Sequence, residues 1–231
     1  MQRPYKTYKG GKNGSGVYQA IINQIPPHEI FISGFAGNCG VMANKKTAAI
    51  ANIVTDTDAA VVNDWKKISG ITAINEDAIS FINCFLSESI EQNIFIFLDP
   101  PYLMEVRSCK KNIYKKEMGD PATHLKLLQA CRKIKHPVLI THYPCSLYDN
   151  ELKDWRKLDI QGRTRHGMRT ERLYMNYPQP EELHDYSFIG QNYRQREMYK
   201  RSKVNMIKKF LKMPPIERNF IISELKSNKI I

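Results

Sequence analysis

Residues 94–102 read Ile-Phe-Ile-Phe-Leu-Asp-Pro-Pro-Tyr, an apolar run that stops at Asp99. Five successive apolar residues favour a strand that is buried on both faces, as in a parallel sheet. The two prolines end it, because each fixes φ and neither has an N–H to give to a ladder. In open α/β sheets, ligands bind at the carboxyl ends of the strands. We therefore expect Asp99 and Tyr102 at a ligand-binding edge, although an acid after a strand can also merely cap a turn.

Segments of strand and helix character alternate through the first 142 residues. Alternation of this kind predicts βαβ units, a mostly parallel sheet with right-handed crossovers and hence a Rossmann-like α/β fold. We expect strands at 29–33, 48–55, 71–74, 94–98 and 137–142, and helices at 17–25, 59–67, 78–89 and 123–135.

After Trp155 the alternation gives way to short basic and aromatic pieces, with a last helical segment at about 192–212. The net charge is +12, and residues 156–231 hold 17 Lys and Arg against 8 Asp and Glu, which is +9 of that total. A basic part of this kind suggests a polyanionic partner, although a well-solvated surface explains charge alone equally well. We expect a core over residues 1–155 and a small basic extension, 156–231, that completes the fold and contacts nucleic acid.

The composition narrows the class of protein. With 231 residues, 42% of them apolar, the chain can bury one substantial core. No stretch reaches the roughly 18–20 apolar residues of a membrane span, and the first residues lack the apolar segment of a secretory signal. The five cysteines form no Cys-x-x-Cys pair, which indicates reduced thiols and not a zinc site or a disulfide framework. We expect a cytoplasmic protein without a metal or membrane partner, and we leave its oligomeric state open.

A glycine-rich turn, Gly-Phe-Ala-Gly-Asn-Cys-Gly at 34–40, follows the first expected strand. Glycine lets a backbone approach a ligand closely, and the next helix begins with free N–H groups. Asp56 stands 19 residues after Gly37, at the end of the second expected strand, where an acid can accept hydrogen bonds from both hydroxyls of a ribose. This pattern alone does not separate S-adenosylmethionine (SAM) from a nicotinamide dinucleotide.

Two motifs together resemble the SAM-dependent DNA adenine methyltransferases related to bacterial Dam. Asp-Pro-Pro-Tyr at 99–102 is similar to the catalytic motif of that family, and Lys-Thr-Tyr-Lys-Gly-Gly-Lys at 6–12 is similar to its opening. The resemblance covers about residues 5–185. It implies the SAM-dependent methyltransferase fold, with residues 1–155 as the SAM-binding catalytic core. The cofactor-binding residues that it implies are Tyr8 packed on the cofactor, Lys12 at its carboxylate, Phe35 and Gly37 in the turn, Asp56 on the ribose, Asp77 at the adenine, and Asp99.

The chain departs from this family at several points. The family usually has Glu where the chain has Ser33, and a second loop glycine where it has Cys39, so both positions would weaken SAM binding. Asp77 can equally well be the cap of the helix that follows it. Dam-type enzymes also insert a long target-recognition region, but only 62 positions separate Gly37 from Asp99, which leaves no room for it.

The resemblance implies a catalytic role for three residues of the motif. The exocyclic amine of adenine is a poor nucleophile, because its lone pair is delocalised into the ring. Asp99 would accept one amino hydrogen, the carbonyl of Pro100 the other, and Tyr102 would stack on the base. A base inside a duplex is out of reach, so the target must be flipped out or already unpaired. The methyl carbon of a sulfonium is electrophilic by itself, so this chemistry requires no metal.

Target reading must then come from elsewhere in the chain. The first candidate is the segment 161–172, because its glycines permit close approach and arginine suits phosphates and guanine edges. Its candidate nucleic-acid-binding residues are Arg163, Arg165, Arg169 and Arg172. A solvated hairpin or loop is the alternative explanation. Residues 103–120 are the second candidate, and the run 193–212 would lie along phosphates or form an exposed helical face.

We therefore predict a SAM-dependent methyltransferase acting on the 6-amino group of adenine in DNA. One alternative is the same chemistry on RNA. Another is a nucleic-acid-binding protein on the same scaffold, weakened in catalysis by Ser33 and Cys39. Methylation of the cytosine 4-amino group stays open, although those enzymes more often have Ser in place of Asp99. A nicotinamide-dependent oxidoreductase would leave the Asp-Pro-Pro-Tyr motif without a role.

Overall fold

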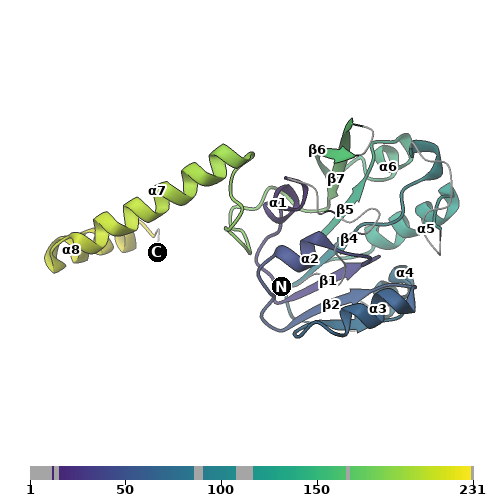
Figure 1. Ribbon diagram of the computed structural model, residues 1–231, viewed down its shortest axis with the longest axis horizontal. Coiled ribbons are helices and arrows are strands. Elements are labelled where there is room, and N and C mark those ends of the chain that lie inside the picture. The colour runs from purple at the N-terminus through teal and green to yellow at the C-terminus, as the bar shows by residue number, and fades with distance from the viewer. Residues whose placement is uncertain (1–11, 13–15, 86–90, 108–116, 165–166, 230–231) are drawn as a thin grey trace. The chain divides into compact units, whose positions relative to one another are not determined.

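The computed structural model describes residues 12, 16–85, 91–107, 117–164 and 167–229, the side chains of residues 85, 163 and 164 excepted. The chain forms two compact units, residues 1–188 and 189–231 (Figure 1). Tyr8 and Arg165 lie outside the described residues, so their predicted roles stay predictions.

The first unit is built on a seven-stranded sheet with the order β3-β2-β1-β4-β5-β7-β6. Strands β1 to β5 are parallel to their neighbours, and β7 runs antiparallel to both β5 and β6. The strands are β1 (Ile30–Gly34), β2 (Ala51–Thr55), β3 (Thr72–Ile74), β4 (Ile94–Leu98), β5 (Val138–His142), β6 (Arg156–Thr164) and β7 (Gly167–Met175). This order, with one reversed strand, is that of the SAM-dependent methyltransferase fold, so the predicted fold class is confirmed.

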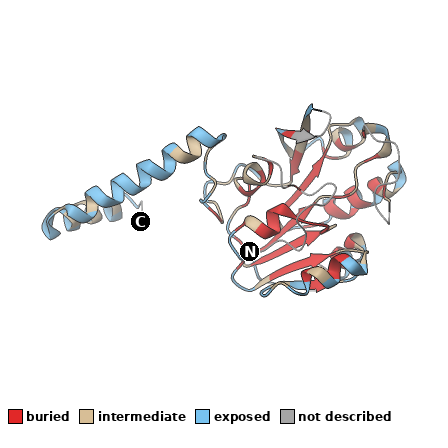
Figure 2. Ribbon diagram, viewed as in Figure 1, coloured by how far each residue is buried: buried red, intermediate tan, exposed pale blue. Residues whose placement is uncertain are grey.

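Helices cover both faces of the sheet. Side chains of α1 (Val17–Ile22), α2 (Gly40–Asn44) and α3 (Ala59–Trp65) share one buried cluster with Phe95 and Phe97 of β4. Side chains of α4 (Ala78–Phe85), α5 (Pro121–Arg132) and α6 (Ser146–Glu151) share the other with Ile94, Ile96 and Leu98. Successive side chains of a strand point to opposite faces, so β4 contributes to both clusters and is buried throughout, as its sequence predicts (Figure 2).

The division of the chain differs from the expected boundary after residue 155. The segment 156–175 forms a β-hairpin, and β7 continues the sheet next to β5, with Leu139 opposite Met175. Residues 156–188 therefore belong to the first unit. The strand signal of β6 is short: polar and apolar residues alternate only over Lys157, Leu158, Asp159 and Ile160, and residues 161–164 contain no apolar side chain.

The second unit contains two helices, α7 (Tyr193–Lys212) and α8 (Pro215–Ser227). The side chain of Asn192 caps α7 by accepting a hydrogen bond of 3.0 Å from the N–H of Gln195. Neither helix contains a buried residue (Figure 2). The sequence predicts α7 but not α8. In the part of the chain that the structure describes, no helix is long and apolar enough to cross a bilayer.

Candidate active site

The turn after β1 is shaped by close packing and by two backbone contacts. Gly34 is required at the end of β1, since a Cβ there would lie 2.7 Å from Leu98 Cδ2. Phe35 and Gly37 both have positive φ, 57° and 45°. Asp56 Oδ2 accepts a hydrogen bond of 2.9 Å from the N–H of Gly37, and Trp65 Nε1 donates one of 2.7 Å to its carbonyl. The structure thus brings Asp56 to the turn, as the 19-residue spacing predicts.

Asp56 lies at the carboxyl end of β2 with both carboxylate oxygens directed at backbone. Its Oδ1 accepts a hydrogen bond of 2.8 Å from the N–H of Asp58. Burial raises the pKa of Asp56, and the hydrogen bonds from Asp58 and Gly37 oppose that rise. A carboxylate offers about four acceptor sites. Asp56 can therefore accept further hydrogen bonds from a ligand.

The two departures from the family pattern contact each other. The hydroxyl of Ser33 donates a hydrogen bond of 3.4 Å to Cys39 Sγ, and both side chains are buried. Cys39 Sγ also accepts from the N–H of Met42 at 3.3 Å, so the thiol caps α2. Burial raises the pKa of Cys39. These residues therefore stabilise the start of α2 from inside the core.

Five polar side chains meet at the carboxyl end of β4. Thr141 Oγ1 donates a hydrogen bond of 2.7 Å to Asp99 Oδ1, and Lys12 Nζ lies 2.9 Å from the same oxygen. Lys12 Nζ is also 3.3 Å from Glu171 Oε2 and donates a 2.5 Å hydrogen bond to the hydroxyl of Tyr102. That hydroxyl in turn donates to Glu171 Oε2 at 3.4 Å. The cluster joins β4, β5, β7 and the N-terminal segment.

The cluster is buried and carries a net negative charge. The side chains of Lys12, Asp99 and Glu171 are 6%, 17% and 12% exposed. Burial alone would lower the pKa of Lys12, but the Asp99 and Glu171 carboxylates together raise it well above its ordinary value. Burial raises the pKa of Asp99, and the ammonium of Lys12 opposes that rise. Burial also raises the pKa of Tyr102 well above its ordinary value, so the phenol stays protonated. Two carboxylates and one ammonium leave a net charge of −1.

The turn that carries Tyr102 is fixed by backbone contacts on both sides. Arg107 Nε donates a hydrogen bond of 2.5 Å to the Tyr102 carbonyl, and Arg107 pairs with Glu117 at 2.6 Å. The N–H of Leu103 donates to His142 Nε2 at 3.0 Å. His142 Nδ1 must then carry the proton, which it donates to the Tyr143 carbonyl at 2.7 Å. The His142 ring stacks on Tyr148 at 4.1 Å. Tyr102 is thus held in place by its main chain.

Two predicted cofactor residues have different surroundings from those expected. The ammonium of Lys12, expected at the carboxylate of the cofactor, lies among the groups of the catalytic motif. Asp77 Oδ2 accepts hydrogen bonds from the N–H groups of Ile79 and Ser80 at 3.1 and 3.0 Å. Asp77 therefore caps α4, as the alternative interpretation of this residue predicts. A contact of Asp77 with the cofactor adenine stays a prediction.

The described arginines of the predicted contact segment, Arg163, Arg169 and Arg172, lie on β6 and β7. Arg172 pairs with Asp159 at 2.6 Å and with Asp149 at 3.0 Å, so its guanidinium has a structural role. The guanidinium of Arg169 lies 4.0 Å from the centroid of the Tyr143 ring and donates to the Val106 carbonyl. Arg163 lies near the tip of β6. Contact of this hairpin with nucleic acid stays a prediction.

Sequence reasoning missed three residues of the site: Thr141, His142 and Glu171. The position of Thr141 and His142 at the end of the last expected parallel strand was the available signal. Glu171 lies in the same segment as the four predicted contact arginines. An acid among such arginines does not suit a phosphate, and this was the available signal that its side chain has a different role. Among the described residues, no cluster of His, Cys, Asp and Glu could hold a metal ion.

Comparison with known proteins gives distant structural likenesses. No protein-family model matches the chain, and no curated protein sequence matches it. The METTL16 methyltransferase domain aligns with a TM-score of 0.47 and 12% identity, over 70% of this chain and 67% of that one. The N-methyltransferase NodS of Bradyrhizobium japonicum aligns with a TM-score of 0.45 and 11% identity, over 71% of this chain and 93% of that one.

An rRNA methylase from Streptococcus thermophilus aligns with a TM-score of 0.42 and 10% identity, over 68% of this chain and 92% of that one. The chain spans only 58% of the length of another similar structure, MtNAS. Likenesses this distant carry no substrate or partner over to this protein. Its function has to be argued from its own residues.

Proposed function

We propose that this protein transfers the methyl group of SAM to the 6-amino group of adenine in DNA. The observation that carries the proposal is the cluster at the carboxyl end of β4. Asp99 and Tyr102 stand there on a rigid proline turn, at the sheet edge where α/β proteins bind ligands. The resemblance of this motif to adenine methyltransferases supplies the substrate.

The residues present suit SAM as the methyl donor. Its ribose hydroxyls match the remaining acceptor sites of Asp56, which is held beside the turn after β1 by Gly37. Its positively charged sulfonium matches the net charge of −1 formed by Lys12, Asp99 and Glu171. When bound, SAM supplies an electrophilic methyl carbon. Ser33 and Cys39 leave this arrangement intact, because their contacts lie within the core.

The motif residues prepare the target nitrogen for attack. Asp99 accepts one amino hydrogen, and the Pro100 carbonyl accepts the other, which moves the nitrogen toward tetrahedral geometry and frees its lone pair. The ring of Tyr102 stacks on the flipped or unpaired base. The hydrogen bond from Thr141 and the contacts of Arg107 and His142 hold Asp99 and Tyr102 in place. Precise placement is needed because a displacement of about 1 Å can reduce a rate on the order of a hundredfold.

The test is transfer of tritium from methyl-labelled SAM to DNA and to RNA in parallel, followed by nucleoside analysis. We expect calorimetry to detect SAM binding and label to accumulate as N6-methyladenine in DNA. Label in RNA alone would move the substrate to RNA, and label in cytosine would change the target amine. SAM binding without transfer to either polymer would favour a binding protein on this scaffold. The absence of SAM binding would contradict the proposal.

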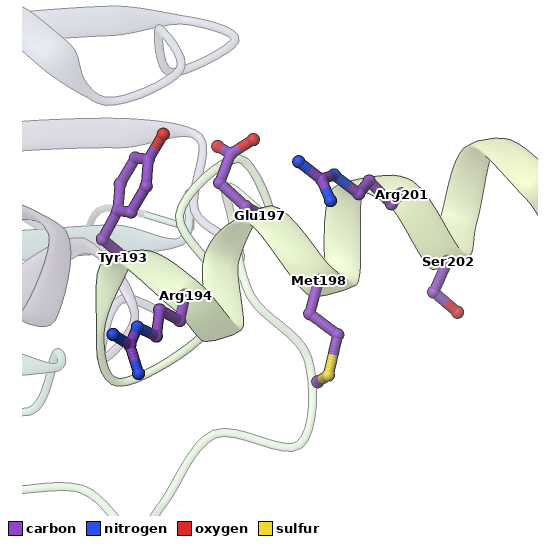
Figure 3. Close-up of a pocket in the computed structure, with 6 residues that line it drawn as sticks. All are labelled: Tyr193, Arg194, Glu197, Met198, Arg201 and Ser202. Carbon is purple, nitrogen blue, oxygen red and sulfur yellow. The ribbon is translucent and has the colours of Figure 1, made fainter.

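We further propose that α7 contributes to holding the nucleic acid. This helix has eight Lys and Arg against one Glu. At 100° per residue, Arg194, Arg201, Lys208 and Lys212 fall on one line along it, and all four are exposed. None of the four forms an ion pair with another described residue. The first three of these cations are about 10 Å apart along the helix axis and Lys212 is about 6 Å beyond Lys208, and such a row suits a phosphate backbone. Figure 3 shows a pocket that is bordered by α7 residues alone, and Arg194 and Arg201 are two of them.

Replacing Arg201 and Lys208 together by alanine should weaken DNA binding and lower the slope of log K against log salt by up to about two units. Filter binding over a series of salt concentrations measures both quantities. The matched control is the pair Arg196 and Lys203, which has the same residue types and spacing but lies on the opposite side of the helix. Equal losses in both double variants would show that only total charge matters and would overturn the row of cations as a contact.

A further inference from the structure

Glu171 is a buried carboxylate at the candidate active site, and the mechanism above counts its charge but gives it no contact with the substrate. It lies on β7, which neither motif of the sequence includes. Its Oε2 is 3.3 Å from Lys12 Nζ and accepts the hydrogen bond of Tyr102 at 3.4 Å. Gly162 on β6 leaves room for it, since a Cβ there would lie 3.3 Å from Glu171 Oε1. Burying a carboxylate costs free energy unless it is paired, so its position requires an explanation.

The charge of Lys12 supplies that explanation. The ammonium is 2.9 Å from Asp99 and 3.3 Å from Glu171, so it is attracted to both carboxylates to a similar degree. With Asp99 as its only partner, Lys12 would neutralise it, and the net charge of this ion pair would be zero. A neutral pair would attract neither the cationic methyl donor nor the positive charge that develops on the attacked amine. With Glu171 present, one negative charge remains.

We propose that Glu171 is a positioning residue that takes up the positive charge of Lys12, so that Asp99 keeps its negative charge for the sulfonium and the adenine amine. This inference rests on the proposed function. The function itself requires only Asp99, Pro100, Tyr102 and a bound methyl donor. The inference requires in addition that the charges of Lys12 and Glu171 cancel, so that the negative charge of Asp99 acts on the sulfonium of that donor.

The affinity ratio of SAM to S-adenosylhomocysteine (SAH) measures this charge directly. The two molecules differ by the methyl group and its positive charge, since SAH contains a neutral thioether. A change that merely disturbs packing weakens both affinities together and leaves the ratio unchanged. A change of charge beside the sulfonium alters the ratio. Calorimetry gives both affinities without nucleic acid and without turnover.

Four proteins complete the test: the wild type, Glu171→Gln, Lys12→Met and the double variant. We expect Glu171→Gln to lower the SAM-to-SAH ratio by about tenfold, the scale of one unit charge several ångströms away in a part-buried site. Lys12→Met should raise the ratio above that of the wild type. The double variant retains Asp99 alone, with a charge of −1, and should return to the wild-type ratio. Glu171→Asp, which keeps the charge, should remain near the wild type.

The control is Glu29→Gln. Glu29 precedes β1 and so lies at the opposite edge of the parallel sheet, where its side chain accepts a hydrogen bond of 3.0 Å from the N–H of Asn93. Its substitution should leave the ratio unchanged. A Glu171→Gln ratio within twofold of the wild type, or a double variant no better than Glu171→Gln, overturns the inference while the proposed function stands. If the wild type binds neither SAM nor SAH, both fall.

Discussion

Replacing Asp99 by alanine is expected to abolish detectable methyl transfer while the protein remains folded. Loss of the group that accepts the amino hydrogen removes catalysis on the order of 10²–10⁴-fold, the range typical of a positioned acid–base group. The fold should survive because Lys12 keeps Glu171 as an ion-pair partner at 3.3 Å. Initial rates of tritium transfer measure the activity, and thermal unfolding followed by circular dichroism checks the fold.

The matched control for Asp99 is Asp154→Ala. Asp154 is also ion-paired, with Arg132 at 2.6 Å, but the pair is solvent-exposed and its loss should leave the rate unchanged. An Asp99→Ala variant that is folded and retains more than about a tenth of the wild-type rate is incompatible with a positioned acceptor. Asp99 would then be only the cap of the turn after β4.

The second large effect concerns stability in acid. His124 and His142 are buried and neutral in the fold. Burial lowers the pKa of His142 to about 3 and that of His124 to about 4. His124 Nδ1 accepts from the Tyr148 hydroxyl at 2.8 Å, and its Nε2 donates to the Met118 carbonyl at 2.6 Å. Since both rings serve as donor and acceptor at once, a proton added to either breaks a hydrogen bond.

These histidines make the first unit less stable as the pH falls. In the unfolded chain each has a pKa near 6.5, so between about pH 6.5 and 4 the unfolded state binds more protons than the folded state. The free energy of unfolding therefore decreases with falling pH across this window, and it is independent of these groups above it. At pH 5 the loss is about 2 kcal/mol for each histidine. Urea unfolding at pH 7, 6 and 5 measures it.

His142→Asn tests the assignment, because it removes one titrating group. Its amide can still accept a hydrogen bond and donate one, as His142 does for Leu103 and Tyr143. The variant should be less stable at pH 7 but should lose less stability between pH 7 and 5 than the wild type. A wild-type stability that is constant from pH 7 to 5 would mean that these rings can be protonated within the fold.

The sequence by itself determined the strand–helix frame and the place of the catalytic motif. Unbroken apolar runs such as Ile94–Leu98 can be satisfied only by burial on both faces, and prolines end such a strand at a definite residue. The same reasoning placed Asp56 beside Gly37, since the carboxyl ends of adjacent parallel strands meet at one edge. These are short-range rules, so local sequence was enough to predict them.

Only the tertiary structure decided which distant side chains complete the site. Lys12 and Glu171 are 159 positions apart and meet because β7 pairs with β5 and turns one of its faces toward the end of β4. The β6–β7 hairpin was only the alternative explanation of residues 161–172, because a segment rich in polar and basic residues suits a solvated loop as well as a strand with one exposed face. Strand pairing is set by long-range burial and not by local spacing. For that reason the charge balance around Asp99 could not be read from the sequence alone.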